Sequence, residues 1–378
     1  MGDLKINERL IVINPGSTST KVAFFTGDEK QWVENIAHPA DELAVFPRVV
    51  DQLDYRLDAL RRELHNKNFD MSGVTAIAAR GGLLKPVSGG VYAVDEVMLE
   101  DLSEERFGQH ASNLGALLAH KLGSPYGIPS YIVDPICVDE LEPVARISGL
   151  PQIRRRSVFH ALNQKRQARW AAQELGKKYE EANLIVAHLG GGITIGAHRR
   201  GRVVDVNNGV DGEGPFTPER SGSLPAADVV RLAFSGRYTW EELLRLINGR
   251  GGFVAYLGTN SAREVEERAA AGDEEADLIF TALCYQVARE IGACAAVLAG
   301  RVDAVVLTGG LAYSRRVVEE IRTRVGFIAP VLVFPGEDEM AALAEGVLRV
   351  LRGEEALRSY QYEGVGWANM EEKVSGDN

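Results

Sequence analysis

The side chains best suited to phosphate chemistry lie where apolar runs end. The first apolar run ends at Asn14, and a hydroxyl-rich stretch from Ser17 to Thr20 follows, with Lys21 beside it. Small residues in such a turn expose backbone N–H groups, which together with hydroxyls can hold a phosphate. The order Gly-x-x-x-x-Gly-Lys-Ser/Thr of a Walker A loop is absent. The stretch therefore predicts a strand–loop–strand phosphate site, with an ordinary hairpin turn as the alternative.

Other polar side chains occupy similar positions at strand ends or in loops. Arg80 follows the apolar run 76–79 and precedes two glycines, and Asp134 follows the run 131–133. Singly, such residues are usually surface ion pairs or structural histidines. Together they suit phosphoryl transfer, because arginines bind phosphoryl oxygens, carboxylates bind Mg²⁺ and glycine loops bind nucleotide phosphates. The whole set is Asn14, Arg80, Asp134, His160, His188, Arg220, Arg263 and Glu337.

The elements that must position these residues occur twice. The strand and loop of residues 11–21 are echoed by residues 184–196, and the strand ending in Gly-Gly at 75–84 is echoed at 303–312. This repetition predicts an α/β protein of two related domains that give glycine loops to one cleft. We expect one domain at residues 1–134 plus about 345–378, and a nucleotide-binding domain at 135–344. Helices are expected at the following ranges: 103–122, 157–175, 276–299 and 338–352.

Composition limits the class of protein. The chain has 378 residues, which favours two domains, with 25% charged and 45% hydrophobic residues. Its formal net charge of -11 argues against nucleic acid or an anionic membrane as a partner. Three cysteines without metal-like spacing and the absence of an apolar segment able to span a bilayer predict a cytoplasmic protein.

The motifs together resemble those of the acetate and butyrate kinases, members of the sugar kinase–Hsp70–actin superfamily, along nearly the whole chain. The forms Ala79-Arg-Gly-Gly82 and Pro335-Gly-Glu-Asp-Glu339 are more similar to the butyrate kinase branch. The resemblance implies two RNase H-like, actin-like ATPase domains around a central cleft, and a homodimer or higher homo-oligomer. The other matching motifs are Asn14–Lys21, Val158–His160, His188–Gly192, Glu219–Gly222 and Thr308–Leu311.

The resemblance also implies how ATP or ADP is bound. Its phosphates would lie against the glycine loop, with the transferred phosphoryl group near the first hairpin and the adenosine near the second Gly-Gly strand end. Mg²⁺ would accompany the nucleotide, with Glu337 as its carboxylate. The residues implied for the nucleotide are Asn14, Ser17, His188, Gly190, Gly191, Gly192, Thr308, Gly309, Gly310 and Leu311.

For the carboxylate or acyl phosphate, the resemblance implies a second set of residues. Arg80 and Arg220 would bind the acyl phosphate, Asp134 would position it, and His160 would donate to phosphoryl oxygens. The substrate pocket would be lined by Gly81, Gly82 and Phe159. One position departs from the family pattern, because Ser261 stands where an Asp is usual, and this weakens the assignment of the nearby Arg263.

The acyl chain is inferred from the glycines after Arg80. Acetate kinases carry valines there, so Gly81 and Gly82 predict a larger pocket and a preference for butyrate or isobutyrate. Each buried methylene is worth about 0.8 kcal/mol. A carboxylate is ionised at neutral pH, so direct in-line transfer needs no general base and no phosphoenzyme. In the alternative interpretation the glycines serve only the turn.

Other functions remain as alternatives. An acetate or propionate kinase is the nearest, and chain-length preference separates it from a butyrate kinase. A nucleotide switch of the Hsp70 or actin type would require a peptide-binding appendage or a polymerising surface. A sugar kinase would need a base for a neutral hydroxyl, and Asp134 is the candidate for that role. A Rossmann dehydrogenase is disfavoured because no Gly-x-Gly-x-x-Gly follows a strand.

Overall fold

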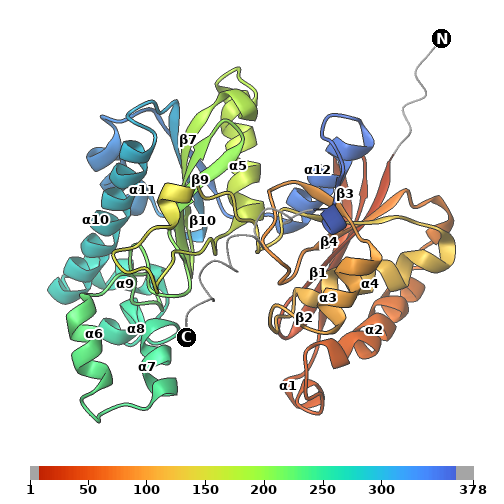
Figure 1. Ribbon diagram of the computed structural model, residues 1–378, viewed down its shortest axis with the longest axis horizontal. Coiled ribbons are helices and arrows are strands. Elements are labelled where there is room, and N and C mark those ends of the chain that lie inside the picture. The colour runs from red at the N-terminus through yellow and green to blue at the C-terminus, as the bar shows by residue number, and fades with distance from the viewer. Residues whose placement is uncertain (1–7, 363–378) are drawn as a thin grey trace. The chain divides into compact units, whose positions relative to one another are not determined.

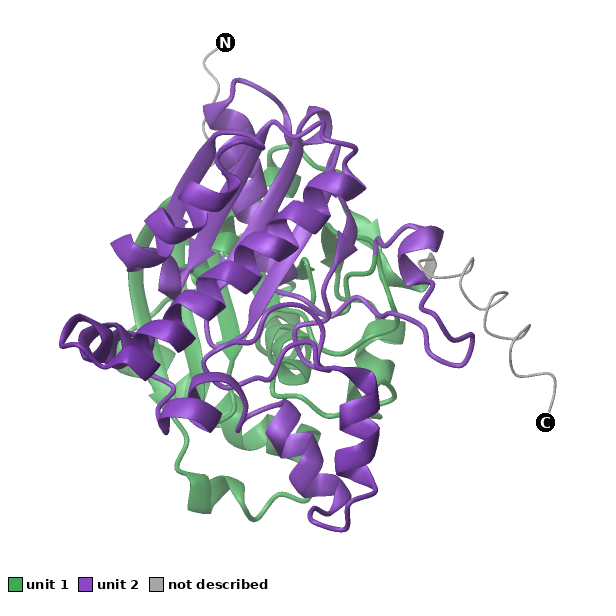
Figure 2. Cartoon of the chain, turned by 90° about the vertical axis from the view of Figure 1, so that its left-hand side faces the viewer, with its two compact units in different colours: residues 1–139, 338–378 green, residues 140–337 purple. Residues whose placement is uncertain are grey.

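A computed structural model describes residues 8–362 of the chain. Two compact units divide it, one of residues 1–139 and 338–378 and the other of residues 140–337 (Figure 2). The expected boundaries were after residue 134 and at about 345, whereas these units divide after residues 139 and 337. The expected position at about 345 lies inside helix α12 (Glu339–Leu351), and the whole helix belongs to the first unit.

The first unit is built on a seven-stranded sheet with the order β12-β5-β6-β4-β1-β2-β3 (Figure 1). Strands β1, β2 and β3 form an antiparallel meander, and β4 and β6 run parallel to β1. The strands are β1 (Arg9–Pro15), β2 (Ser19–Thr26), β3 (Glu29–Ala37), β4 (Ala76–Arg80), β5 (Val91–Ala93), β6 (Ser130–Val133) and β12 (Arg358–Ser359).

Helices cover both faces of this sheet. On one face Ile11, Ile77 and Ile132 pack in a core with the apolar sides of α2, α3 and α4. On the other face α12 packs against β1, β4 and β6. The helices of this unit are α1 (Ala40–Leu43), α2 (Leu53–Asn66), α3 (Glu96–Ser103), α4 (Asn113–Gly123) and α12.

The second unit repeats the same topology in a five-stranded sheet of order β11-β10-β7-β8-β9. Strands β7, β8 and β9 form the antiparallel meander, and β10 and β11 run parallel to β7. This correspondence confirms the predicted duplication, with β7 matching β1 and β10 matching β4. The strands are β7 (Asn183–Leu189), β8 (Ile193–Arg199), β9 (Arg202–Val206), β10 (Ala304–Gly309) and β11 (Val331–Pro335).

Alternation along β7 and β10 buries both faces of the second sheet. Ile185 and Val305 belong to the core with α10 and α11, whereas Val186 and Val306 pack on the α5 side (Figure 1). The helices are α5 (Ala161–Glu174), α6 (Ala226–Ala233), α7 (Trp240–Ile247), α8 (Gly252–Leu257), α9 (Ala262–Ala270), α10 (Glu274–Val297) and α11 (Arg315–Val325).

Helix α10 corrects one expectation, because its length and composition would allow it to cross a membrane, with a mean hydropathy of 1.2. Its residues Phe280, Leu283 and Ile291 are instead buried in the core that covers β7 and β8. Long apolar core helices pass the same test, so the helix is weak support for a membrane span.

Two predicted helices differ from those observed. The range 103–122 contains two separate helices, since α3 ends at Ser103 and α4 begins at Asn113. The helix expected from Ser157 begins at Ala161, and His160 is its N-cap residue rather than part of its first turn. Ser157 makes no cap because the chain stays non-helical until His160, whose backbone carbonyl accepts from the amide of Gln164 at 2.9 Å.

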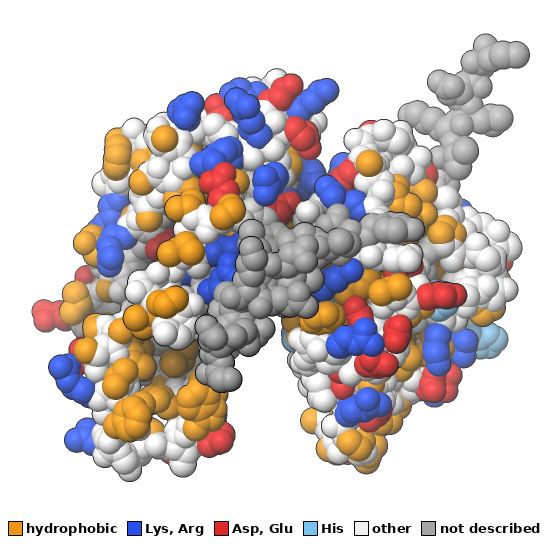
Figure 3. Space-filling model, in the orientation of Figure 1, with side chains coloured by type: hydrophobic (Ala, Val, Ile, Leu, Met, Phe, Trp, Pro, Cys, Tyr) orange, Lys and Arg blue, Asp and Glu red, His pale blue; other side chains and the backbone are white. Residues whose placement is uncertain are grey.

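Helices α6 and α7 expose apolar side chains. Neither helix has a buried residue, and Phe234 and Trp240 are 88% and 71% exposed. Figure 3 shows hydrophobic side chains gathered over this part of the second unit. Apolar surfaces of this kind often mark contacts with other molecules.

Candidate active site

Arg56 of α2 forms hydrogen bonds with the backbone of the hydroxyl-rich loop in the first unit. This guanidinium is 1% exposed and donates to the carbonyls of Gly16 (2.8 Å), Ser17 (2.9 Å) and Ser19 (3.0 Å). With these carbonyls turned towards Arg56, the loop is fixed in one conformation. Ser17 itself is exposed, as a phosphate-binding residue must be. Sequence reasoning missed Arg56, because nothing in its helical context distinguishes it from the neighbouring Arg61 and Arg62.

The side chains that accept hydrogen bonds from Arg56 are neutral. Gln52 Oε1 accepts from Arg56 Nη2 at 2.8 Å, and Thr20 Oγ1 accepts from Nη1 at 3.2 Å. Thr20 Oγ1 also lies 2.8 Å from Nε2 of His38, whose pKa burial and the charge of Arg56 lower to about 4. Burial lowers the pKa of Arg56 to about 10, so the side chain stays charged at neutral pH.

Arg56→Lys is expected to raise the KM for ATP or lower kcat about tenfold, because one ammonium cannot hold three carbonyls in the geometry of a guanidinium fork. Steady-state kinetics of the purified variant measure the effect, and Arg62→Lys on the exposed side of α2 is the matched control. Unchanged kinetics in Arg56→Lys would show that the loop needs no such support.

At the end of β4, Arg80 lies next to Glu339 and Asn14. The Arg80 guanidinium donates to one Glu339 oxygen, and Asn14 Nδ2 donates to the other at 2.6 Å. Burial raises the pKa of Glu339, but the charge and hydrogen bond of Arg80, with the Asn14 bond, outweigh burial and hold that pKa below its usual value. Glu339 is therefore ionised at neutral pH, and Arg80 is held at the strand end.

The Nε atom of Arg80 is buried and has no acceptor in the described part of the chain. A buried charged donor without a partner is costly and marks a place where a ligand is expected. His110 adds to this neighbourhood, since burial and the charge of Arg80 both lower its pKa.

The three acidic residues before and in α12 have different surroundings. Glu337, predicted to serve the metal, belongs to the second unit, where its Oε2 lies 3.7 Å from His188 Nε2. Asp338 caps α12 by accepting from Ala341 N at 3.0 Å and pairs with Lys30 at 2.7 Å. Glu339 contacts both Arg80 and Asn14. Sequence reasoning missed it, although its position in the first turn after the Asp338 cap was a usable signal.

Asp134 and the two glycines after Arg80 are packed positions. Asp134 is 2% exposed, has a φ of 37°, and accepts from Gly90 N at 2.7 Å. A Cβ at Gly82 would lie 2.5 Å from Asn113 Oδ1 and 2.6 Å from Asn113 Cα, and one at Gly81 would lie 2.4 Å from Pro135 Cβ. These contacts favour the alternative interpretation that the glycines permit close packing of the strand end, Gly81 against Pro135 and Gly82 against α4.

Gly82→Val is expected to destabilise the protein, since the added side chain must displace the first turn of α4. Overpacking of this kind costs about 1–3 kcal/mol. Thermal unfolding of the variant should show a lowered Tm, with the ratio of acetate to butyrate turnover kept in the folded fraction. A stable variant whose preference shifts to acetate would restore the pocket interpretation.

In the second unit, His160 and His188 stack beside the glycine loop that joins β7 to β8. Their ring centroids are 3.8 Å apart with an interplanar angle of 15°. His188 Nδ1 lies 2.9 Å from Asn163 Oδ1, and His160 Nδ1 lies 2.9 Å from Thr194 Oγ1. The neighbouring Phe159 is 5% exposed.

Arg220 and His160 both approach Gly192. A Cβ there would lie 2.5 Å from Arg220 Nη1 and 3.2 Å from His160 Cε1, so only glycine admits both. The Arg220 guanidinium donates to the Gly209 carbonyl, while its Nε is buried without an acceptor among the described residues. Burial lowers the pKa of Arg220. The structure thus brings together His160, His188, Arg220 and the loop of Gly190, Gly191 and Gly192.

The second Gly-Gly strand end lies next to this loop. Thr308 pairs with His188 across the parallel strands, and its Oγ1 donates to the Gly336 carbonyl at 3.1 Å. Gly309 has a φ of 87°, and a Cβ there would meet the Leu189 carbonyl at 2.4 Å, so the position requires glycine. Gly310 is exposed, whereas Leu311 is buried in the core and supports the turn.

Two further predicted residues lie apart from this cluster. Arg263 is 89% exposed and pairs with Glu267, and Ser261 caps α9 by accepting from Glu264 N at 3.2 Å. Ser261 thus has a structural role at a helix start. Among the described residues, no group of three or more His, Cys, Asp or Glu side chains is arranged to hold a metal ion.

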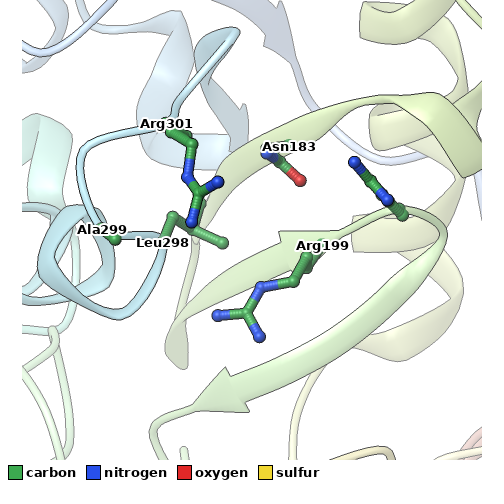
Figure 4. A pocket seen from close by; sticks show the side chains of 6 residues that line it. Asn183, Arg199, Leu298, Ala299 and Arg301 are labelled. Carbon is green, nitrogen blue, oxygen red and sulfur yellow. The ribbon is translucent and has the colours of Figure 1, made fainter.

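A pocket of about 370 Å³ occurs in the second unit at the other end of β7 from the glycine loop. It is lined by Asn183, Leu298, Ala299 and the arginines 199, 200 and 301 (Figure 4). Arg199 donates to the Val297 carbonyl at the end of α10. None of the predicted site residues lines this pocket.

Comparison with known proteins agrees with the fold described above. Residues 151–329, just under half of the chain, match the model of the Acetokinase family. Acetate kinase from Porphyromonas gingivalis is 20% identical with a TM-score of 0.74, over 91% of this chain and all of that one. Acetate kinase from Entamoeba histolytica is 16% identical (TM-score 0.72), and a propionate kinase from Francisella tularensis is 18% identical (0.70). Each of these two matches covers 90% of this chain and 98% of the other.

At these identities the matches show the fold. The chain has the duplicated α/β architecture of these kinases, which confirms the predicted fold class.

Proposed function

We propose that the protein is a carboxylate kinase, which transfers the γ-phosphoryl group of ATP reversibly to a short-chain fatty acid and gives an acyl phosphate and ADP. The match of residues 151–329 to the Acetokinase family supports this assignment. Nucleotide phosphates would bind at Gly190–Gly192, with Thr308 to Leu311 towards the adenosine. Asn14 and Ser17 would lie near the transferred phosphoryl group, and Arg80 would bind the acyl phosphate. We expect the protein to work in the cytoplasm.

The observation that carries the proposal is the state of the two arginines. Arg80 and Arg220 each keep a buried Nε donor without an acceptor in the described residues. A planar guanidinium group can donate two parallel hydrogen bonds to two oxygens of one anion, such as a carboxylate or a phosphate. An anionic acceptor suits this pair better than the neutral hydroxyl of a sugar.

For this reaction the protein has to position the two substrates and to supply positive charge near the phosphoryl group. A carboxylate with a pKa of about 4 is already a nucleophile at neutral pH, so no general base is required. The difficulty is repulsion between the acid and the phosphates, which Arg80 and Arg220 would reduce. His160 and His188 would donate to phosphoryl oxygens. Mg²⁺ would enter with ATP and neutralise phosphate charge, and Glu337 or the ionised Glu339 would supply a carboxylate ligand.

The preferred acid is the finer part of the proposal. Motif forms such as Pro335-Gly-Glu-Asp-Glu339 favour butyrate or isobutyrate. The packing of Gly82 removes one argument for the longer chain, and the structural likeness to acetate and propionate kinases favours those acids as the alternative.

The test is acyl phosphate formation from ATP and Mg²⁺, trapped with hydroxylamine, for acids from formate to hexanoate including isobutyrate. A maximum of kcat/KM at four carbons supports a butyrate kinase, and a maximum at two or three supports the alternative. Glucose serves as a neutral acceptor in the same assay. Phosphorylation of glucose but of no acid would contradict the proposal.

A further inference from the structure

A line of buried polar side chains leads from the interior of the second unit to His160. Tyr179 Oη lies 2.8 Å from His198 Nδ1, and His198 Nε2 lies 3.0 Å from Gln164 Oε1. Gln164 Nε2 lies 2.8 Å from Thr194 Oγ1, which in turn lies 2.9 Å from His160 Nδ1. Tyr179, Gln164, Thr194 and His198 are each less than 5% exposed, so water does not compete for these bonds.

The orientation of the Gln164 side-chain amide determines which groups donate and which accept along this line of hydrogen bonds. Its Nε2 also lies 2.9 Å from the backbone carbonyl of Thr194, which can only accept. This atom must therefore be the amide nitrogen, and Oε1 must be the acceptor that faces His198. It follows that His198 Nε2 carries a proton and donates it to Gln164.

The other nitrogen of His198 follows from its surroundings. Burial and the nearby charges of Lys165 and Arg169 hold the pKa of His198 well below its usual value, so the ring is neutral. With the proton on Nε2, Nδ1 is bare and accepts from the Tyr179 hydroxyl. Lys165 is itself paired with Glu140 at 2.9 Å, which balances its buried charge.

The donor and acceptor roles of Thr194 and His160 can be assigned in the same way. Gln164 Nε2 and, at 3.5 Å, the backbone N–H of His160 both donate to Thr194 Oγ1. These two bonds use both lone pairs of the hydroxyl, so its own proton is directed to His160 Nδ1. We propose that Tyr179, His198 and Gln164 act through Thr194 as positioning residues, which hold His160 in the tautomer with its proton on Nε2. This inference rests on the proposed function, in which that Nε2–H donates to a phosphoryl oxygen.

Gly196 of β8 lies against this line of hydrogen bonds, and its lack of a side chain leaves space for Gln164 and His198. A Cβ at that position would lie 2.5 Å from Gln164 Oε1 and 3.2 Å from His198 Nε2. Any other residue would push the amide and the imidazole apart. Gly196→Ala therefore breaks the line without removing any of its polar groups.

A fixed, neutral donor suits the reaction. The His160 ring stacks on His188 at 3.8 Å, where two imidazolium ions would repel each other. A histidine whose Nδ1 is occupied by a hydroxyl donor presents Nε2–H without a choice of tautomer. The donor then needs no reorganisation when charge develops on the phosphoryl oxygens.

The direct test is NMR of protein labelled with ¹⁵N at its seven histidines, using the His160→Gln variant to assign the His160 signals. In the wild type, His160 is expected to carry its proton on Nε2. In Thr194→Val and Gly196→Ala the signals should show a mixture of both tautomers, and Thr194→Ser should restore the wild-type pattern. A His160 with its proton on Nδ1 in the wild type would overturn the inference.

Kinetics distinguish this role from a purely structural one. Thr194→Val should lower kcat about tenfold with the KM for ATP changed less than twofold, since the donor acts on the transferred group. Thr323→Val, at an exposed threonine of α11, is the control and should leave kcat unchanged. Thermal unfolding checks that each variant is folded. Thr194→Val with kcat and tautomer both unchanged, or with tautomers mixed and kcat unchanged, would contradict the proposal.

The tautomer measurement needs no catalysis. If no carboxylate is phosphorylated, the proposed function fails while the NMR result still decides how His160 is held. If carboxylates are phosphorylated and the tautomer is Nδ1–H, only the positioning inference fails.

Discussion

Glu339→Gln is expected to lower kcat for acyl phosphate formation about 100-fold, the size of effect seen when one preorganised charge contact is lost from an active site. The substitution keeps the shape of the side chain but removes the charge that fixes the Arg80 guanidinium. Asn14 keeps an oxygen to donate to, so the fold of the first unit should be little affected.

Glu337→Gln is the matched comparison, two positions earlier in the chain. Its carboxylate is 48% exposed and lies 3.7 Å from His188 Nε2, so a loss of less than tenfold is expected. Both variants are measured by the hydroxylamine assay at several Mg²⁺ concentrations. A larger loss in Glu337→Gln would return the metal role to Glu337, as the sequence first predicted.

Arg80→Ala has the largest expected effect, a loss of about 1,000-fold in kcat/KM for the carboxylate. Arginines that stabilise transferred phosphoryl groups are worth factors of this size. Removal of Arg80 also leaves the Glu339 charge without its partner beside an anionic substrate. Arg80→Lys should recover only part of the activity, because an ammonium lacks the planar fork.

Steady-state kinetics with varied acid and saturating ATP measure this loss. The control is Arg200→Ala in the pocket of Figure 4, where an arginine is removed at the far end of the second sheet and activity should be unchanged. A loss under tenfold in Arg80→Ala would mean that the strand end of β4 does not bind the acid.

The duplicated fold could be predicted because the same order of strands and glycine-rich loops can be recognised in each half of the sequence. Residues 11–21 and 184–196 became the hairpins β1–β2 and β7–β8, and the two Gly-Gly runs became the ends of β4 and β10. Strand ends in equivalent positions of two related sheets carry the polar residues. Motif order alone therefore placed most of the candidate residues at strand ends or in the loops beside them.

The sequence could not show which of several neighbouring residues contacts which part of the site. Glu337, Asp338 and Glu339 are similar in type, and only their places around the start of α12 give one to His188, one to the helix cap and one to Arg80. Buried residues that hold a loop in place, such as Arg56, also have no recognisable pattern in the sequence. The break at residues 104–112 was missed because apolar spacing continues on both sides of it.

The glycines after Arg80 show a further limit. Their small size was interpreted as space for substrate, but the contacts of Gly81 and Gly82 show that protein atoms fill that space. A missing side chain has two explanations, an open pocket or a close approach, and only coordinates distinguish them.

The central claim, direct transfer of a phosphoryl group from ATP to a carboxylate, is tested most directly by a single turnover with [γ-³²P]ATP, Mg²⁺ and butyrate, quenched on the millisecond scale. The label should pass from ATP into a hydroxylamine-sensitive acyl phosphate with none on the protein. Label on the protein that moves to the acid at the rate of turnover, or label released only as inorganic phosphate, would contradict the account.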